Sequence, residues 1–187
     1  GQIGRLRAKV GLCRGLDAWD RFDHAAARRL LQPFQAQMVP QWIFLKHLTG
    51  EDRRTRLEPV LDLVLNARRC AARRRFDDAV ARLYRALEML AQTRLLQLKP
   101  AVNTSDVDLA SLPAGAQRIF NQPGPDGKIK LGLVRAYELL QALNDPLGLA
   151  FAAKRTRLLD ALLIRNQSIL AHGTRPVSRA PGHASGG

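Results

Sequence analysis

Cysteine and aromatic residues are scarce in this 187-residue sequence. The two cysteines, Cys13 and Cys70, lie far apart, and neither has another cysteine or a histidine at the spacing of a zinc site. No disulfide framework is indicated, and a reducing cytoplasm fits this usage. Aromatic residues make up 5% of the chain, whereas alanine, leucine and arginine are abundant. Since that usage is typical of helices rather than strands, the composition predicts an all-α protein.

Long apolar runs are also missing. The longest is LGLAFAA, residues 147–153, far shorter than the roughly 20 residues that cross a bilayer. The chain opens without the pattern of a signal peptide. We therefore expect no membrane partner and a cytoplasmic location. The opening residues GQIGRLRAKV already have the pattern of a helix, which indicates a piece of a longer protein.

Acidic residues are few compared with basic ones. The chain has 16 Asp and Glu against 30 Lys and Arg, which gives a net charge of +14 and an isoelectric point near 11.2. A polyanion such as a nucleic acid is the natural partner of such a protein. An arginine-rich, solvated surface would give the same charge without a partner, so the charge alone does not decide between them.

Apolar residues recur at spacings of three and four along most of the sequence, which predicts helices. The expected helices cover residues 3–22, 23–32, 57–74, 75–98, 113–121, 131–144 and 150–172. Asp23 and Asp77 are the expected N-caps of the second helix and of the 75–98 helix. The 75–98 helix should be the longest, with an apolar stripe wide enough for burial.

Proline-rich and polar stretches divide these helices. Pro33 and Pro40 are expected to bracket an irregular stretch that reaches Phe44, and the polar residues 49–54 mark the best boundary. A second irregular connection is expected over residues 99–126. The sequence thus predicts three parts: a helical segment over residues 1–52, a helical domain over 53–175 and a disordered tail over 176–187.

The last expected helix ends in the segment RNQSILAHG, residues 165–173. Arg165 and His172 are seven positions apart and therefore share one face of a helix. Gly173 is a natural end signal, and the unpaired carbonyls of a last turn favour a protonated imidazole. The spacing is commonplace in an arginine-rich chain, and a histidine that merely lies beside a helix end would show it too.

The segment RNQSILAHG resembles the signature of the HEPN superfamily, with Arg165, Asn166 and His172 at the matching positions. The stretch DDAVARLYRALEMLAQTRL resembles the first core helix of that fold. Together with LDAWDRFDHAAARRLL, these segments resemble the C-terminal half of CRISPR-associated CARF-HEPN proteins. The resemblance implies an HEPN-like helical bundle preceded by an N-terminal helical segment, which would connect it to a sensor domain absent from this chain. In that family the CARF sensor binds a cyclic oligoadenylate, and the HEPN domain cuts single-stranded RNA.

This resemblance implies an endoribonuclease that needs no metal ion or other cofactor. In RNA cleavage by the 2′-hydroxyl, His172 could transfer protons, Arg165 could stabilise the charge on the phosphorane, and Asn166 could orient either the phosphate or the ring. No cluster of carboxylates accompanies the motif, which argues against a two-metal mechanism. Since one histidine cannot act as both acid and base, and since the family pairs two HEPN domains, we expect a homodimer.

Two further groups of residues are candidates for the same site. Arg85 and Glu88, one turn apart in the 75–98 helix, could support the motif, or they could form an ordinary solvated pair. The basic run at residues 69–75, together with Arg82, could contact RNA phosphates or could simply be a solvated face. Two other functions remain open for the whole chain: a catalytically silent RNA- or nucleotide-binding dimerisation module, and a helical scaffold for protein interactions.

Overall fold

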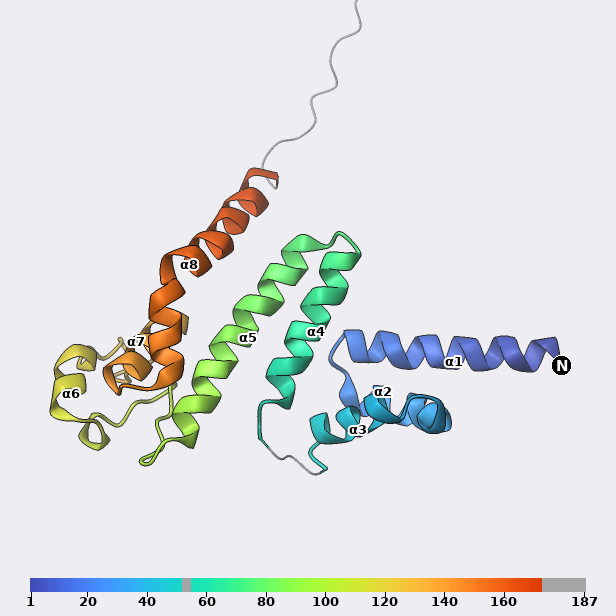
Figure 1. Cartoon of the computed structure of the whole chain (residues 1–187), viewed down its shortest axis with the longest axis horizontal. Coiled ribbons are helices and arrows are strands. Elements are labelled where there is room, and N and C mark those ends of the chain that lie inside the picture. Colours follow the sequence, from blue (N-terminus) through green and yellow to red (C-terminus); the bar gives the residue numbers. More distant parts are fainter. Residues whose placement is uncertain (52–54, 173–187) are drawn as a thin grey trace, which may run out of the picture.

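The computed structural model describes the backbone at residues 1–51 and 55–172, and the side chains of these residues as far as residue 161. Within this part the chain forms eight α-helices, two short 3₁₀-helices and no strand, which confirms the expected all-α class (Figure 1). The elements are α1 (Gln2–Asp20), α2 (His24–Leu31), η1 (Gln32–Gln37), α3 (Val39–Leu48), α4 (Glu58–Ala72), α5 (Phe76–Gln97), η2 (Leu109–Ser111), α6 (Ala114–Phe120), α7 (Leu133–Ala142) and α8 (Pro146–His172).

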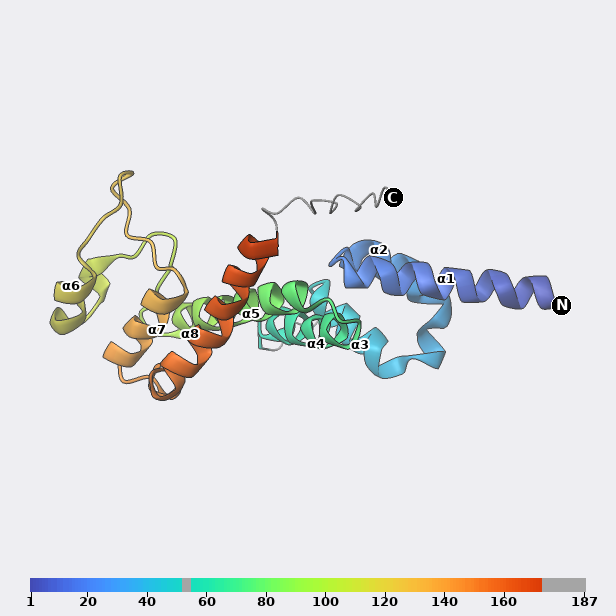
Figure 2. The same cartoon turned by 90° about the horizontal axis from the view of Figure 1, so that it is seen from above.

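The helices follow one another along the long axis of the molecule. Figure 1 and Figure 2 both show α1–α3 at one end, the antiparallel hairpin of α4 and α5 in the middle, and α6–α8 at the other end. Helix α8 runs antiparallel to α5 and contacts both α5 and α7. None of the described helices is both long and apolar enough to cross a bilayer. The hairpin therefore joins the N-terminal helices to the helix that ends at His172.

The start of α2 is as predicted from the sequence, whereas the segment that follows α2 differs from the prediction. Asp23 is the N-cap of α2, and its carboxylate accepts a hydrogen bond of 3.0 Å from the backbone N–H of Ala26. The prediction of an irregular stretch around Pro33 and Pro40 is wrong, because η1 and α3 occupy these residues. Each proline lies in the first turn of its helix, where the missing N–H has no intrahelical partner to lose.

Three expectations for the later helices are also wrong. Helix α5 begins at Phe76 with Arg75 as N-cap, so Asp77 lies inside the first turn, where its charge still complements the helix dipole. Helix α8 has 27 residues and is longer than α5, which has 22. It begins at Pro146 rather than near residue 150, because a proline fits the first helical position.

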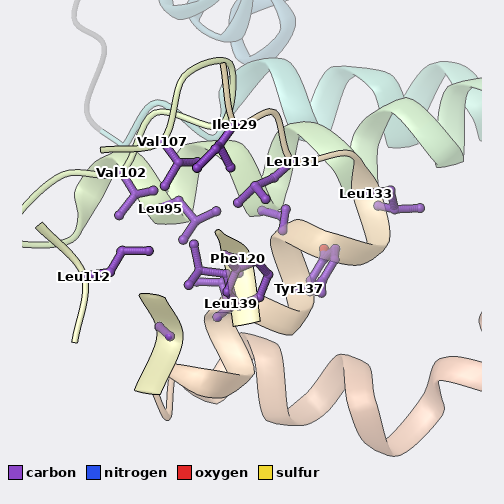
Figure 3. Close-up of a cluster of buried hydrophobic side chains, with 14 of the residues drawn as sticks. Leu95, Val102, Val107, Leu112, Phe120, Ile129, Leu131, Leu133, Tyr137 and Leu139 are labelled. Atoms are coloured by element: carbon purple, nitrogen blue, oxygen red, sulfur yellow. The ribbon is translucent and has the colours of Figure 1, made fainter. Parts of the chain in front are cut away.

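The largest hydrophobic cluster lies where α5, α7 and the start of α8 meet (Figure 3). The long connection after α5 contributes to it and is held by backbone hydrogen bonds from Val107 to Ile129 and from Leu131 to Thr104. The fully buried members with the largest side chains are Tyr137, Phe120, Leu95, Leu139 and Leu140. A smaller separate cluster holds α1, α2 and α3 together.

Candidate functional site

Helix α8 carries the Arg-to-His segment, and its backbone is helical from Pro146 to His172. At about 1.5 Å per residue, Arg165 and His172 are about 10.5 Å apart along the axis and lie on one side of the helix. The side chains of Arg165, Asn166 and His172 lie outside the described residues, as does Gly173. The structure therefore places the motif on one continuous helix, and the contacts of the earlier residues show how this helix is positioned.

Asp145 fixes the start of α8. Its Oδ1 accepts a hydrogen bond of 2.9 Å from the backbone N–H of Leu147, as an N-cap does. Its Oδ2 accepts a bond of 2.8 Å from Nε of Arg94 on α5. The carboxylate of Asp145 is buried, so these partners replace the water that it loses. One side chain thus caps α8 and ties it to α5.

Gly148 allows α8 to approach α7 very closely. A Cβ atom at this position would lie 2.2 Å from the backbone nitrogen of Gln141 and 2.4 Å from the carbonyl carbon of Leu140. Both are backbone atoms and cannot turn aside as a side chain can. Only glycine therefore permits the observed packing of the first turn of α8 on α7.

Aromatic and charged contacts continue this packing along α8. The rings of Tyr137 and Phe151 stack with their centroids 4.0 Å apart, and the Tyr137 hydroxyl donates a bond of 3.0 Å to the carbonyl of Leu87. Burial raises the pKa of Tyr137 from 10.0 to about 12. Further along, Arg155 pairs with Glu138 of α7 at 3.0 Å. The first part of α8 is therefore held by both α5 and α7.

The end of α8 lies on the same side of the molecule as the turn between α4 and α5 (Figure 1). Figure 2 shows the last turns of α8 rising out of the plane of the α4–α5 hairpin. Because α5 and α8 run antiparallel from the contact of Arg94 with Asp145, Phe76 at the start of α5 is about 27 Å from that contact along its helix. Arg165 is about 30 Å from it along α8. The motif therefore lies at the level of the α4–α5 turn.

Arg85 and Glu88 form the ion pair that their spacing allows. Nη1 of Arg85 lies 2.7 Å from Oε2 of Glu88, and it also donates to the side-chain oxygen of Gln92 at 3.3 Å. By the same helix geometry, this pair is level with residues near 151–154 of α8, about 15–20 Å short of Arg165. Within one chain, Arg85 and Glu88 therefore do not lie beside the Arg165–His172 motif along the axes of α5 and α8.

The arginines around the α4–α5 turn mostly have partners inside the chain. Arg69 and Arg73 each bind one carboxylate oxygen of Asp20 at 2.7 Å. Arg75 pairs with Asp78 at 2.6 Å. Arg82 donates to the side-chain oxygen of Asn66 at 2.8 Å and lies over the ring of Phe22, 5.5 Å from its centroid. Arg74 is exposed at the turn. Much of the basic run thus fastens the N-terminal helices to the hairpin.

Two buried polar residues of α4, Asp62 and Asn66, take part in this packing through hydrogen bonds. They were not among the residues predicted from the sequence. Asp62 is 1% exposed and accepts a hydrogen bond of 3.0 Å from Nε1 of Trp19, while Nε2 of His24 lies 2.8 Å from its other oxygen. Asn66 is 2% exposed and donates to the carbonyl of Asp20 at 3.0 Å. A polar pair four residues apart in the apolar stretch LDLVLN was the available signal, because such residues are buried only with partners.

Metal coordination has no candidate in the described region. At residues 1–51 and 55–161, no three side chains of His, Cys, Asp or Glu are gathered closely enough to hold a metal ion. The chemistry that the described contacts support is positioning: Asp145, Gly148 and Tyr137 fix α8, and the Asp20, Asp62 and Asn66 contacts fix the N-terminal helices on the hairpin.

The chain also resembles a known family over most of its length. A family model described as Csm6 HEPN domain matches residues 52–181, which include all of α4 to α8. No curated protein and no solved structure matches the chain.

Proposed function

The chain belongs to the family of Csm6 HEPN domains, which is CRISPR-associated, and we propose that it is an endoribonuclease that cuts single-stranded RNA. The observation that carries the proposal is that the family match extends through α8, where Arg165, Asn166 and His172 lie on one continuous helix. The excess of basic residues, with a net charge of +14, supports a polyanionic substrate.

In the proposed reaction the 2′-hydroxyl of the RNA attacks the neighbouring phosphorus, and the bond from phosphorus to the 5′-oxygen breaks. One imidazole takes the proton of the hydroxyl, and a second imidazole gives a proton to the leaving oxygen. Arg165 stabilises the additional charge on the phosphorane, and Asn166 orients the phosphate or the imidazole. The products are a 2′,3′-cyclic phosphate and a 5′-hydroxyl, and neither step requires a metal ion.

Since each chain has one histidine in the motif, we propose that the site forms between two copies of the chain. The end of α8 rises out of the plane of the hairpin in Figure 2, where a second copy could approach it. The α4–α5 turn is at the same level and carries Arg74, which could contact a phosphate of the bound RNA. In this arrangement both copies contribute Arg165, Asn166 and His172.

The N-terminal helices support a role in regulation. We assign residues 1–52 as a connector, residues 53–175 as the effector domain and residues 176–187 as a tail. The connector is joined to α4 by the contacts of Asp62 and Asn66, so it and the hairpin should move as one body. A cyclic oligoadenylate would act only through a separate sensor domain coupled to this connector, in defence against viruses in the cytoplasm.

The proposal is tested with a single-stranded RNA that carries a fluorophore and a quencher, in buffer with EDTA. The parent chain is compared with His172→Ala and Arg165→Ala, each checked for native helix content by circular dichroism. We expect cleavage by the parent and a loss of at least about 100-fold in either variant. This is the usual effect of removing a general acid or base, here His172, and of removing a group that stabilises charge in the transition state, here Arg165. The product ends are identified by mass spectrometry, where a 2′,3′-cyclic phosphate is expected.

The other outcomes select different functions. Cleavage that stops in EDTA and returns with one specific metal would oppose the mechanism. Cleavage that both substitutions leave unchanged would oppose the assigned site. RNA binding without cleavage, also in the presence of a sensor domain and its activator, would identify a binding and dimerisation module. A chain that binds no RNA even at low salt would be a protein-interaction scaffold.

A further inference from the structure

A cavity of about 270 Å³ opens between α2, η1 and α3, outside the residues that match the family model. Its lining consists of Ala25, Arg28, Arg29, Gln32 and Trp42. It is slightly smaller than the roughly 300–1,000 Å³ of sites for drug-sized ligands, so it suits one planar group rather than a large molecule. Its wall combines an aromatic ring, two guanidinium groups and an amide.

Packing against the hydrophobic core restricts Trp42, the aromatic residue of the cavity. Trp42 is half-buried, packs against the core that α1, α2 and α3 share, and also lines the cavity. Tryptophan has few rotatable bonds, and this packing restricts them further. A planar ligand could therefore stack on the indole with little additional ordering of the side chain.

The two arginines of the cavity differ in their environment. Arg28 pairs with Glu51 and lies 3.4 Å from the hydroxyl of Thr49, so its charge is offset within the chain. Arg29 is exposed and has no acidic partner among the described residues. A guanidinium in this setting is available to a phosphate, to which it can donate two parallel hydrogen bonds. Gln32 is exposed at the same rim and offers both a donor and an acceptor.

We propose that this cavity binds one unpaired nucleotide of single-stranded RNA, with the base on Trp42, the adjacent phosphate on Arg29 and the base edge on Gln32. Stacking on an aromatic ring beside a cation is how proteins hold unpaired nucleotides. The ligand class rests on the proposed function, whereas the site is separate from α8. Such a site would anchor the substrate at the N-terminal helices and leave the chemistry to the motif on α8.

The test measures binding without cleavage. The probe is a short, fluorescein-labelled single strand of 2′-fluoro RNA, which has no attacking hydroxyl, and its anisotropy is titrated with the full chain. Arg29→Gln is compared with Arg118→Gln, which removes the same charge from an exposed arginine on α6. Trp42→Leu is compared with Trp42→Phe, which keeps a ring for stacking.

We expect Arg29→Gln to weaken binding about five- to tenfold, an effect of about 1–1.4 kcal/mol, and Arg118→Gln to weaken it less than about twofold. Trp42→Leu should weaken binding about tenfold, and Trp42→Phe about threefold or less. If Trp42→Leu does not fold, the pair of arginine variants still decides. Equal losses for Arg29→Gln and Arg118→Gln, equally tight binding of an RNA duplex, or no binding by the parent would each overturn the proposal.

The two proposals can fail separately. If the parent cleaves no RNA but Arg29→Gln selectively loses affinity for the probe, the endoribonuclease proposal fails and the cavity stands. If the parent cleaves RNA and the two arginine variants bind the probe alike, the cavity proposal fails and the proposed activity stands.

Discussion

The indole nitrogen of Trp19 donates a hydrogen bond of 3.0 Å to the carboxylate of Asp62, 43 positions later in the sequence. The other carboxylate oxygen lies 2.8 Å from Nε2 of His24. Asp62 is 1% exposed, so these two groups replace the water that a carboxylate would otherwise bind. Helices α1 and α2 are therefore attached to α4 by a buried polar contact and not only by apolar packing.

This contact leads to a first prediction about stability. Asp62→Ala leaves the indole N–H of Trp19 and the ring nitrogen of His24 without their partner, and each lost partner costs about 1–3 kcal/mol. We expect the free energy of unfolding to fall by about 2–4 kcal/mol. Urea denaturation followed by tryptophan fluorescence measures it. Asp106→Ala, which removes an exposed carboxylate, is the control, and equal effects of the two substitutions would contradict the prediction.

Gly148 leads to a second prediction, in which two identical substitutions have opposite signs. Gly148→Ala places a Cβ atom 2.2 Å from the backbone nitrogen of Gln141, so α7 and α8 must separate. We expect a loss of about 1–3 kcal/mol. Gly4→Ala in α1 meets no atom within 4 Å and should stabilise the helix by about 0.5–1 kcal/mol. Thermal unfolding of both variants checks the difference, and a Gly148→Ala variant as stable as the parent would refute the close packing.

A third prediction concerns the two functions of Asp145. Asp145→Asn keeps an oxygen for the N–H of Leu147 but loses the charge that pairs with Arg94. Asp145→Ala loses the cap as well, which adds about 1 kcal/mol to the cost. We therefore expect the order of stability to be parent, Asn, Ala, as measured by chemical denaturation. Equal stability of the two variants would show that the cap contributes nothing.

Much of the helical framework could be predicted from the sequence, because its signals are local. Apolar spacing identified α1, α4, α5 and α7, and the side chain of Asp23 caps α2 as expected. The segments that resembled HEPN domains belong to a chain that the family match assigns to that group. Local rules failed at Pro40, which is expected to bracket an irregular stretch but lies in the first turn of α3, and at the start of α8, which begins at Pro146 rather than near residue 150.

The positions of the polar groups could not be predicted in the same way. The partners of Asp62 come from α1 and α2, and Asn66 donates to Asp20 of α1, but no spacing in the sequence indicates that α4 packs against these helices. For the same reason the sequence did not show that the arginines near the α4–α5 turn have acidic partners, although Asp20 binds Arg69 and Arg73. The assignment of Arg165, Asn166 and His172 to a catalytic site stays a prediction, because their side chains lie outside the described residues.

Tyr137 leads to a prediction about pH. Burial raises its pKa from 10.0 to about 12, and its hydroxyl donates to the carbonyl of Leu87. Between pH 10 and 12 the unfolded chain has released this proton while the folded chain still holds it. The free energy of unfolding therefore has its full contribution from Tyr137 below pH 10 and loses it as the pH rises through 12.

Tyr137→Phe removes this proton and the hydrogen bond together. Near neutral pH the variant should be less stable by about 0.5–1.5 kcal/mol, the net value of one hydrogen bond. Between pH 10 and 12 the parent should lose stability faster than the variant, so the difference should shrink. Urea denaturation over this range measures both slopes. Parallel pH dependence of the two proteins would mean that Tyr137 does not titrate there.

The last prediction follows from the proposed sharing of the site between two copies. A single His172 per chain can supply one of the two proton transfers in the proposed reaction, so only a dimer would have an acid and a base. The cleavage rate per chain should then fall on dilution below the dissociation constant of the dimer, in step with the dimer fraction seen by sedimentation velocity. An excess of His172→Ala chains should inhibit the parent further, because mixed dimers lack one imidazole, whereas an equal excess of an unrelated basic protein should not. A rate per chain that stays constant where only monomer sediments would mean that one chain carries a complete site, and Arg165 and Asn166 would then need a partner for proton transfer from within their own chain.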